Sequence, residues 1–597
     1  MSVAIAGATE DRSILGACVH GTGARFGLFA DPAGACAVRL FADDGAVVRE
    51  EMMKPLGDGL FEAYVPDVAV GALYKFIVDG RELADPYARY LPRGVDGPAQ
   101  VTQSLFEWQH GPGVSRPLAE HAIYELHVGT FSAAGTYEGV REHLSQLVDL
   151  GITAIELLPV AAFPGQRGWG YEGTALYAPF APYGTPDDLK RLVDEAHGLG
   201  LSVFLDVVYN HFGPSGNHLP SYSRDYFSKD VRNAWGDAPN YAHPIVRRMV
   251  VENALYWLNE FRFDGLRLDA THAIIDKSFT HILRELTEAV ARLEPERILI
   301  AEDNRNDPSV VTETGVDAIW ADDFHHQLRV TMTGERDGYY GAYEAGLADL
   351  ARTIARGWLF EGQTYPVSGQ SRGKPADDLE APSFVYCIQN HDQIGNRALG
   401  DRLSAAVSPA QYRVASTLLL FLPMTPLLFM GQEWAASSPF LFFTDHEPEL
   451  GRRVAEGRRS EFASFGAFAD PETRARIPDP QDVSTFEASR LNWQEREQGE
   501  HARTLELYKK LLWLRGSDPV LSSASRRELS ASNVGEVLLV RSGGAQGRRV
   551  LVANFGDRPI PLAELVLGHE PRILLRSDLG VLDATELPKH TAAILAD

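Results

Sequence analysis

Eight short apolar segments alternate with amphipathic segments of helical periodicity, and this alternation constrains the fold more than any other feature of the chain. Strands that are buried on both faces have this composition, whereas half-exposed strands alternate polar and apolar residues. Eight such strands with helices between them predict a closed (β/α)8 TIM barrel of the α/β class. The predicted strands are 122–128, 153–160, 202–208, 264–270, 297–302, 317–321, 383–389 and 426–430, and the clearest helices are 187–200, 247–261 and 281–293.

All-β segments flank this barrel on both sides. Short strand-like runs separated by Gly, Pro and Asp turns predict an antiparallel, immunoglobulin-like β-sandwich before it. Similar runs after it predict a small C-terminal β domain, and a Pro- and Gly-marked stretch at 108–121 predicts a linker. We therefore expect a multidomain α/β protein with a β-sandwich over 1–110, a barrel with inserted loops over 111–519 and a β domain over 520–597. The flanking runs are 26–30, 37–42, 59–65 and 72–80, then 534–542, 548–556, 572–577 and 591–596.

Composition excludes several classes of function. The 56 Lys and Arg residues against 81 Asp and Glu residues give a net charge of −25, which repels phosphate backbones, so we expect no nucleic-acid partner. The three cysteines, Cys18, Cys36 and Cys387, form no CxxC pair and predict neither a disulfide framework nor a zinc site. The first residues lack a signal-peptide pattern, and the most apolar run, 417–431, is too short to span a bilayer. We expect a cytoplasmic protein without membrane contact.

Polar side chains gather where four of the predicted strands end. The third strand ends in DVVYNH, the fourth in GLRLDATH, the fifth in IAEDN and the seventh in QNHDQIGN. In a barrel the carboxyl ends of all strands open onto one face, where catalysis occurs. The pattern therefore predicts one site that contains Asp206, His211, Arg267, Asp269, Glu302, His391 and Asp392.

Two of these carboxylates lie in surroundings that are expected to shift their pKa values in opposite directions. Arg267 precedes Asp269 by two positions, so both point to the same side of a strand, and the guanidinium favours the ionised form of the carboxylate. Glu302 follows an apolar run, and a poorly hydrated glutamate has a raised pKa and can hold a proton. Such a pair is what glycoside hydrolysis needs. A single acid at a strand end is more often a helix cap, and Asp206 remains open to a purely structural role.

Metal binding is the rival interpretation of the same cluster. Asp206, Asn210, His211 and His391 are residue types that ligate divalent cations, but the nearby Arg267 argues against a cation there. We therefore expect no metal and no cofactor. The chain also lacks a GxSxG motif at a strand-to-helix turn and a phosphate-binding P-loop, which excludes serine-hydrolase and nucleotide chemistry.

The four motifs in this order resemble those of the α-amylase superfamily, glycoside hydrolase family 13, and the resemblance extends over roughly residues 12–597. It implies a retaining mechanism on α-glucosidic bonds. Asp269 would be the nucleophile, Glu302 the general acid and base, and Asp392 the carboxylate that stabilises the transition state. The resemblance also implies a set of residues that bind the sugar in subsite −1, including the aromatic platform in GWGYEG. These are Tyr171, His211, Arg267 and His391, and Asp206 is a further substrate-binding candidate.

Later segments narrow this resemblance within the superfamily. DDFHH at 322–326 and the segments 442–462 and 476–493 are similar to members that cut the α-1,4 bond next to the terminal trehalose of maltooligosyltrehalose. The resemblance thus implies maltooligosyltrehalose and related α-1,4-glucans as substrates, and segment 442–493 is expected to fold over the barrel mouth. Asp303, Asp323 and His326, at the ends of strands five and six, are candidates for subsites +1 and +2. For each of them a loop cap or a surface charge is an equally good interpretation.

The sequence is also compatible with two other functions. A 1,4-α-glucan branching enzyme, or a general α-glucan hydrolase, would share the nucleophile and the acid and differ in acceptor or substrate. The segments within 442–493 and the NHDQ form of the last motif disfavour the branching enzyme. A catalytically inactive glucan-binding protein belongs to a different class, against which the complete set Asp269, Glu302 and Asp392 argues. We expect a monomer.

Overall fold

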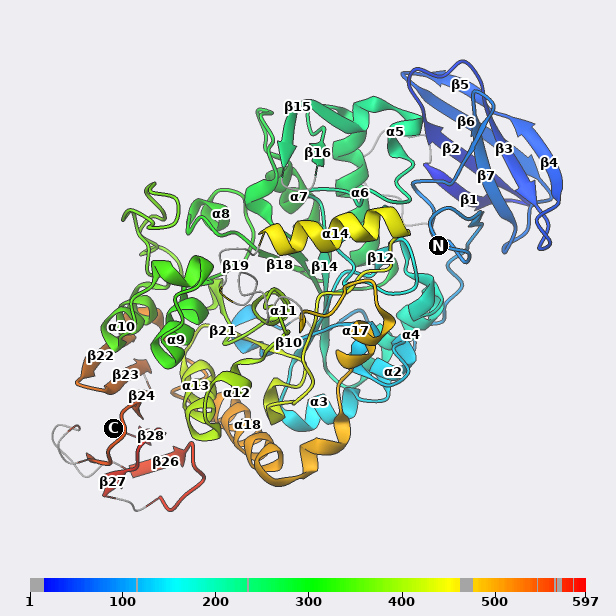
Figure 1. Cartoon of the computed structure of the whole chain (residues 1–597). Helices are drawn as coiled ribbons and strands as arrows, with labels where there is room; N and C mark the ends of the chain where they lie inside the picture. The colour runs from blue at the N-terminus through cyan, green and yellow to red at the C-terminus, as the bar shows by residue number, and fades with distance from the viewer. Residues whose placement is uncertain are drawn as a thin grey trace.

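The computed structural model describes residues 15–596, apart from 114–115, 234–235, 462–465, 467–475, 545, 563–564, 566–571 and 583–584. Most of the N-terminal stretch without a signal-peptide pattern, residues 1–14, lies outside the described residues. An N-terminal β-sandwich and a C-terminal sheet lie at opposite ends of a central barrel (Figure 1). The predicted multidomain α/β architecture is therefore confirmed.

Eight parallel strands close into the barrel in chain order, as the alternation of segments predicts. Every strand residue is buried except the half-buried Ile298, because helices and loops cover the strands on the outside and side chains fill the inside. The strands are β10 (Ile123–Leu126), β11 (Ala154–Leu157), β14 (Ser202–Val207), β17 (Gly265–Leu268), β18 (Ile298–Ala301), β19 (Ala318–Trp320), β20 (Phe384–Tyr386) and β21 (Thr425–Phe429).

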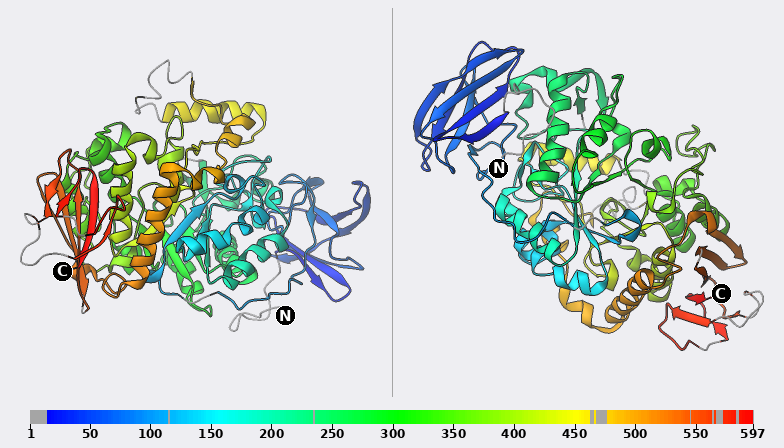
Figure 2. Two further views of the ribbon diagram at one scale, coloured as in Figure 1. Left: turned by 90° about the horizontal axis from the view of Figure 1, so that it is seen from below. Right: turned by 180° about the vertical axis from the view of Figure 1, so that it is seen from behind.

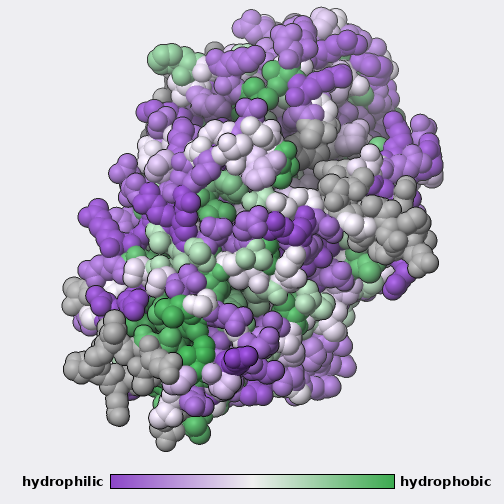
Figure 3. Space-filling view, turned by 60° about the vertical axis from the view of Figure 1, so that its left-hand side comes forward, coloured by the Kyte–Doolittle hydropathy of each residue, from purple (hydrophilic) through white to green (hydrophobic). Residues whose placement is uncertain are grey.

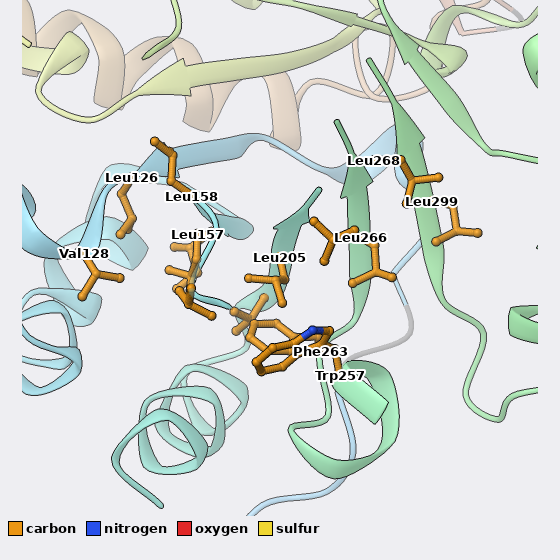
Figure 4. Packing of buried hydrophobic residues seen from close by; sticks show 14 of the residues in the cluster. Leu126, Val128, Leu157, Leu158, Leu205, Trp257, Phe263, Leu266, Leu268 and Leu299 are labelled. Atoms are coloured by element: carbon orange, nitrogen blue, oxygen red, sulfur yellow. The ribbon is translucent and has the colours of Figure 1, made fainter. Parts of the chain in front are cut away.

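The helices bury one face against the outside of this barrel. Figure 4 shows Leu205 and Leu266 of two barrel strands in one apolar cluster with Trp257 of the helix between them, and burial of a leucine side chain contributes roughly 1.5–3 kcal/mol. Helix α4 begins with a capping box between Thr185 and Asp188, which fixes where the chain leaves the preceding loop. The three helices expected from sequence correspond to α4 (Pro186–Gly198), α6 (Pro244–Glu260) and α7 (Ile282–Val290).

Further helices complete the outer layer and the loops. The helices before α9 are α1 (Val128–Phe131), α2 (Tyr137–Arg141), α3 (Leu144–Leu150), α5 (Leu219–Tyr222) and α8 (Ser309–Thr312). Those from α9 onward are α9 (Asp323–Thr333), α10 (Leu347–Arg356), α11 (His391–Gly395), α12 (Leu403–Ala406), α13 (Pro409–Phe421), α14 (Pro448–Glu461), α17 (Val483–Ala488) and α18 (Gly499–Ser517). Two small antiparallel strand pairs form within the loops of the barrel. They are β12 (Ala161–Ala162) with β13 (Ala175–Pro179), and β15 (Phe227–Asn233) with β16 (Gly236–Pro239).

The N-terminal part is a sandwich of two antiparallel sheets. Phe26, Val38 and Phe76 are fully buried in its core. One sheet contains β1 (Gly16–His20), β2 (Gly23–Phe29), β6 (Leu60–Pro66) and β5 (Lys54–Gly57). The other contains β4 (Val47–Met52), β3 (Cys36–Phe41), β7 (Leu73–Val78) and β8 (Arg81–Leu83), with β9 (Ala99–Gln100) on β7.

The C-terminal part is a five-stranded sheet with its own apolar cluster around Val552 and Leu595. Its strands are β22 (Ser530–Val534), β23 (Val537–Gly544), β24 (Gly547–Asn554), β28 (Thr591–Ala596) and β26 (Arg572–Arg576), beside the pair β25 (Ile560–Pro561) and β27 (Glu586–Leu587). The exact domain boundaries at 110/111 and 519/520 stay predictions.

The late segment forms part of the barrel mouth. Figure 2 shows α14 standing over the barrel, and Asp445 just before it accepts a hydrogen bond from the backbone of Gln166 at 2.7 Å and pairs with Arg167 at 3.0 Å. Arg167 also donates to the backbone oxygen of Gln481 at 2.6 Å. These contacts hold the described part of segment 442–493 over the strand ends, as expected from its length.

The surface is chiefly hydrophilic on the face shown in Figure 3, in keeping with the high content of charged residues. Among the helices of the described ranges, none combines the length and the apolar composition needed to cross a membrane.

Candidate active site

Carboxylates from three strand ends converge on the guanidinium group of Arg267, which is fully buried. Its Nη1 donates to both oxygens of Asp206 at 2.8 Å and to Oδ1 of Asp269 at 2.7 Å, and its Nη2 donates to Oε2 of Glu302 at 2.7 Å. The ring of Trp320 lies against the guanidinium, 4.2 Å from centroid to Cζ. The fold thus brings together residues from β14, β17 and the end of β18 around one positive charge.

Asp269 is held as an anion. Burial raises the pKa of Asp269, but the opposing charges of Arg267 and His211 and a hydrogen bond from Asn210 outweigh it, so the pKa lies below its usual value. Asn210 Nδ2 donates to Oδ2 at 2.6 Å, so both carboxylate oxygens have a donor. An ionised and fixed carboxylate suits nucleophilic attack.

Glu302 binds the same guanidinium, but its pKa is shifted in the opposite direction. Burial raises its pKa well above the usual value, Arg267 opposes this, and the negative charges of Asp269 and Asp392 add to the increase. Its Oε2 accepts from Arg267 and from the backbone of Ala270 at 2.9 Å. Within the described residues nothing donates to Oε1, which therefore is the oxygen that can carry a proton.

A second chain of hydrogen bonds links the ends of β10, β14 and β20. His391 Nδ1 donates to Glu125 at 2.6 Å, and His391 Nε2 lies 2.7 Å from the hydroxyl of Tyr171, which donates to Asp206 at 2.6 Å. Burial lowers the pKa of His391, but Glu125 and Asp392 raise it to about 9, so the imidazole is cationic at neutral pH. Burial raises the pKa of Asp206 to about 6, which leaves it ionised there.

Two cavities meet at these carboxylates. The larger one, about 670 Å³ and here called the main cavity, has Asp269, Glu302 and His391 in its wall. The smaller one, about 450 Å³ and here called the second cavity, has Arg305, His326 and Arg372 in its wall. Both share three residues, which therefore mark the junction: Asn304, Asp392 and Asn396.

The remaining residues expected in subsite −1 also lie at the main cavity. Tyr171 and His211 line it, and the Tyr171 ring stacks on the His391 ring with centroids 5.2 Å apart. His211 Nε2 donates to the backbone oxygen of Tyr171 at 3.0 Å, so it supports the loop that carries the aromatic ring. Arg267 and Asp206 are buried behind the cavity wall, where they form an ion pair at 2.8 Å.

Two family models match parts of the chain. The family model for the alpha amylase catalytic domain matches residues 122–241, and the model for carbohydrate-binding module 48, the isoamylase N-terminal domain, matches residues 14–88. A malto-oligosyltrehalose trehalohydrolase of Deinococcus radiodurans is 52% identical over 571 residues, which cover 95% of this chain and 93% of that protein. The chain belongs to the malto-oligosyltrehalose trehalohydrolase family.

Other relatives agree with this membership. The enzyme of the same name from Rhizobium sp. (strain M-11) is 39% identical over 602 residues, which cover 97% of this chain and 98% of that protein. A crystal structure of a candidate alpha amylase from Salmonella typhimurium superimposes with a TM-score of 0.89 at 35% identity, covering 98% of this chain and 99% of that one. The resemblance inferred from the motifs is therefore confirmed at the level of the family.

The three residues expected at subsites +1 and +2 differ in placement. His326 lines the second cavity. The carboxylates of Asp303 and Asp323 are fully buried behind the cavity wall and are not among the residues that line it. Asp303 binds Arg305 at 2.5 Å, and Asp323 lies 3.3 Å from Arg372. The two carboxylates therefore do not line the cavity themselves, but they hold two arginines that do.

Sequence reasoning missed several residues that build the site. Glu125 and Glu156 each interrupt an otherwise apolar barrel strand, and this interruption was the available signal. The motif DVVYNH suggests Asn210 only as a metal ligand, whereas in the structure Asn210 fixes Asp269. Arg372 follows a loop without a motif and gave no signal. Across the described ranges, no group of three His, Cys, Asp or Glu residues is arranged to hold a metal ion.

Proposed function

We propose that the protein is a retaining glycoside hydrolase that cleaves the α-1,4 bond next to the terminal trehalose of maltooligosyltrehalose, releasing trehalose and a maltooligosaccharide. One observation supports this chemistry most directly. Asp269 and Glu302 both bind the buried guanidinium of Arg267, yet the pKa of Asp269 is lowered and the pKa of Glu302 is raised. Membership of the trehalohydrolase family, with a relative 52% identical over nearly the whole chain, supports the choice of bond and substrate.

The first half of the reaction breaks the glycosidic bond. Asp269 attacks the anomeric carbon of the sugar in the main cavity, and Glu302 gives its proton to the departing oxygen, so the leaving trehalose is neutral. Arg267 keeps Asp269 ionised without deprotonating Glu302, because burial and neighbouring negative charges hold the proton there. Retaining enzymes place such carboxyl groups about 5–5.5 Å apart.

The second half releases the sugar from the enzyme. Glu302, now an anion, removes a proton from water, and the resulting hydroxide attacks the glycosyl ester of Asp269 with a second inversion. Two inversions give net retention. Asp392, at the junction of the two cavities, faces the anomeric centre and stabilises the positive charge that develops there in both transition states.

We assign the maltooligosaccharide part of the substrate to the main cavity and the trehalose part to the second cavity. The main cavity holds Asp269 and the aromatic ring of Tyr171, so it takes the sugar that becomes covalently bound. In the second cavity Arg305, Arg372 and His326 offer polar groups for the hydroxyls of trehalose. Asp303 and Asp323 act on subsites +1 and +2 by fixing the two arginines.

Product analysis tests this proposal. Maltotriosyltrehalose and maltopentaose are incubated with equal amounts of enzyme, and trehalose and reducing sugars are separated and quantified. We expect trehalose release from the first substrate and much slower attack on the second. Equal rates would indicate a general α-glucan hydrolase, altered iodine staining of amylose a branching enzyme, and binding without products an inactive glucan-binding protein. A monomeric state and a cytoplasmic location stay predictions from sequence.

A further inference from the structure

Asp392 is anchored differently from the other two carboxylates of the site. Asp269 and Glu302 each bind Arg267 and a further donor, whereas the side chain of Asp392 is 33% exposed. Within the described residues its carboxylate has one hydrogen-bond donor, Asn396 Nδ2 at 3.1 Å, and His391 Nε2 lies farther away at 3.7 Å. The orientation of Asp392 therefore depends on Asn396.

Asn396 is in turn held by the helix that stands over the barrel mouth. Arg458 of α14 donates from Nη1 to Oδ1 of Asn396 at 3.3 Å and from Nη2 to the backbone oxygen of Gly395. Both contacts lie at the C-terminal end of α11, the short helix whose first two residues are His391 and Asp392. One guanidinium thus connects α14 to the segment that presents Asp392.

The opposite side of α11 is fixed by the barrel loops. A Cβ atom on Gly395 would lie 2.1 Å from the Trp169 ring, so α11 rests directly on this indole. Trp169 Nε1 donates to the backbone of Leu441 at 2.9 Å, and the Arg458 guanidinium lies 4.4 Å from the centroid of the Phe442 ring. The helix is therefore clamped between a fixed aromatic ring and Arg458.

We propose that Arg458 is a positioning residue that orients Asp392 for catalysis through Asn396. This inference rests on the proposed function, in which Asp392 stabilises the transition state. Because α14 contributes Val454, Gly457 and Arg458 itself to the wall of the main cavity, the same contact ties the catalytic carboxylate to the helix that covers the bound maltooligosaccharide. Loss of Arg458 leaves Asp392 in place but free to rotate away from the anomeric centre.

Steady-state kinetics of Arg458→Ala and Arg458→Lys test the proposal on two substrates, maltotriosyltrehalose and α-glucosyl fluoride. The fluoride carries one glucose, so a residue that only contacts more distant sugars has no effect on it. Arg452→Ala is the matched control, because Arg452 lies on α14 and pairs with Glu456 at an exposed site. The melting temperature of each variant shows whether it is folded.

We expect Arg458→Ala to lower kcat by roughly tenfold or more on both substrates while KM changes little, because a misoriented catalytic group affects the transition state and not ground-state binding. Arg458→Lys should recover part of the loss, and Arg452→Ala should behave as wild type. In a double-mutant cycle, Asn396→Ala should add little to Arg458→Ala, since both remove the same support.

Three results would overturn the inference: a rise in KM with unchanged kcat, an effect confined to maltotriosyltrehalose, or fully additive losses in the cycle. Each would make Arg458 a direct substrate contact or a residue without influence on Asp392. Failure of the proposed function would look different. In that case the wild-type protein releases no trehalose, or Asp392→Asn is as active as wild type, whatever Arg458→Ala does.

Discussion

His391 Nδ1 and Glu125 Oε1 lie 2.6 Å apart, although the two residues are 266 positions apart in the chain. Both side chains are almost completely buried, and Glu125 also accepts from the backbone nitrogen of His391 at 3.0 Å. This double contact fixes the imidazole ring of His391 and keeps it protonated, so that its Nε2 can donate to the hydroxyl of Tyr171. One glutamate inside the barrel thus sets the protonation state of a residue in the site.

Glu125→Gln should move the alkaline limit of activity to lower pH. The pKa of His391 is raised to about 9, so the cation and its hydrogen bond to Tyr171 persist below that pH and are lost as pH rises through it. Without the carboxylate the proton is lost earlier. The measurement is the pH dependence of kcat/KM. Glu433→Gln, a buried glutamate bound to Tyr124 and not to His391, is the control, and an unchanged alkaline limit in Glu125→Gln would refute the link.

Glu156 should make the folded state less stable as pH rises. It is fully buried, neither carboxylate oxygen has a hydrogen-bond partner within the described residues, and burial together with Glu125 and Asp206 raises its pKa well above the usual value. The folded protein therefore retains a proton that the unfolded chain releases above about pH 4.3. The free energy of unfolding therefore falls by about 1.4 kcal/mol for each unit of pH increase, until pH reaches the pKa of Glu156 in the folded protein.

Glu156→Gln removes this proton uptake and keeps the shape of the side chain. Relative to wild type, the variant should become increasingly stable as pH rises above about 4.3, until the folded pKa of Glu156 is reached. Denaturant titrations at several pH values measure the difference. Parallel stability curves would mean that Glu156 is ionised in the folded protein and that its charge has a partner there.

Activity should survive prolonged treatment with EDTA. The positive charge at the centre of the carboxylate cluster is Arg267, which contacts Asp206, Asp269 and Glu302 at 2.7–2.8 Å, so charge balance there needs no cation. Initial rates before and after chelation and gel filtration provide the measurement. A loss of rate that calcium or magnesium restores would contradict this expectation.

The fold was predictable because burial on both faces leaves a strong signal in sequence. Each barrel strand is a short apolar run, and the two acids that we propose as catalytic follow directly after such runs. Strand ends and barrel geometry together therefore bring Asp269 and Glu302 to one place. Glu125 and Glu156 were missed because they occur within the runs. Only the pairing of β10 with β11, which sets these two residues side by side, reveals a polar layer inside the barrel.

The residues around the second cavity were harder to predict, for a different reason. Asp303 and Asp323 stand near strand ends, but a strand end does not determine whether a carboxylate faces the cavity or a neighbouring loop. Asp323 instead accepts hydrogen bonds from the backbone nitrogens of Leu359 and Phe360 and lies beside Arg372. These partners lie in a loop that follows α10, and no local pattern specifies how that loop packs.

The division of labour between Asp269 and Glu302 is the central claim, and azide rescue of two variants on α-glucosyl fluoride tests it most directly. The fluoride needs no protonation to leave, so Glu302→Gln should still form the glycosyl-enzyme. Azide, which needs no base, should then restore turnover and yield the α-glucosyl azide after two inversions. In Asp269→Ala azide replaces the missing nucleophile, and a single inversion should yield the β-glucosyl azide. The reverse assignment of the two anomers, measured by NMR of the products, would contradict the account.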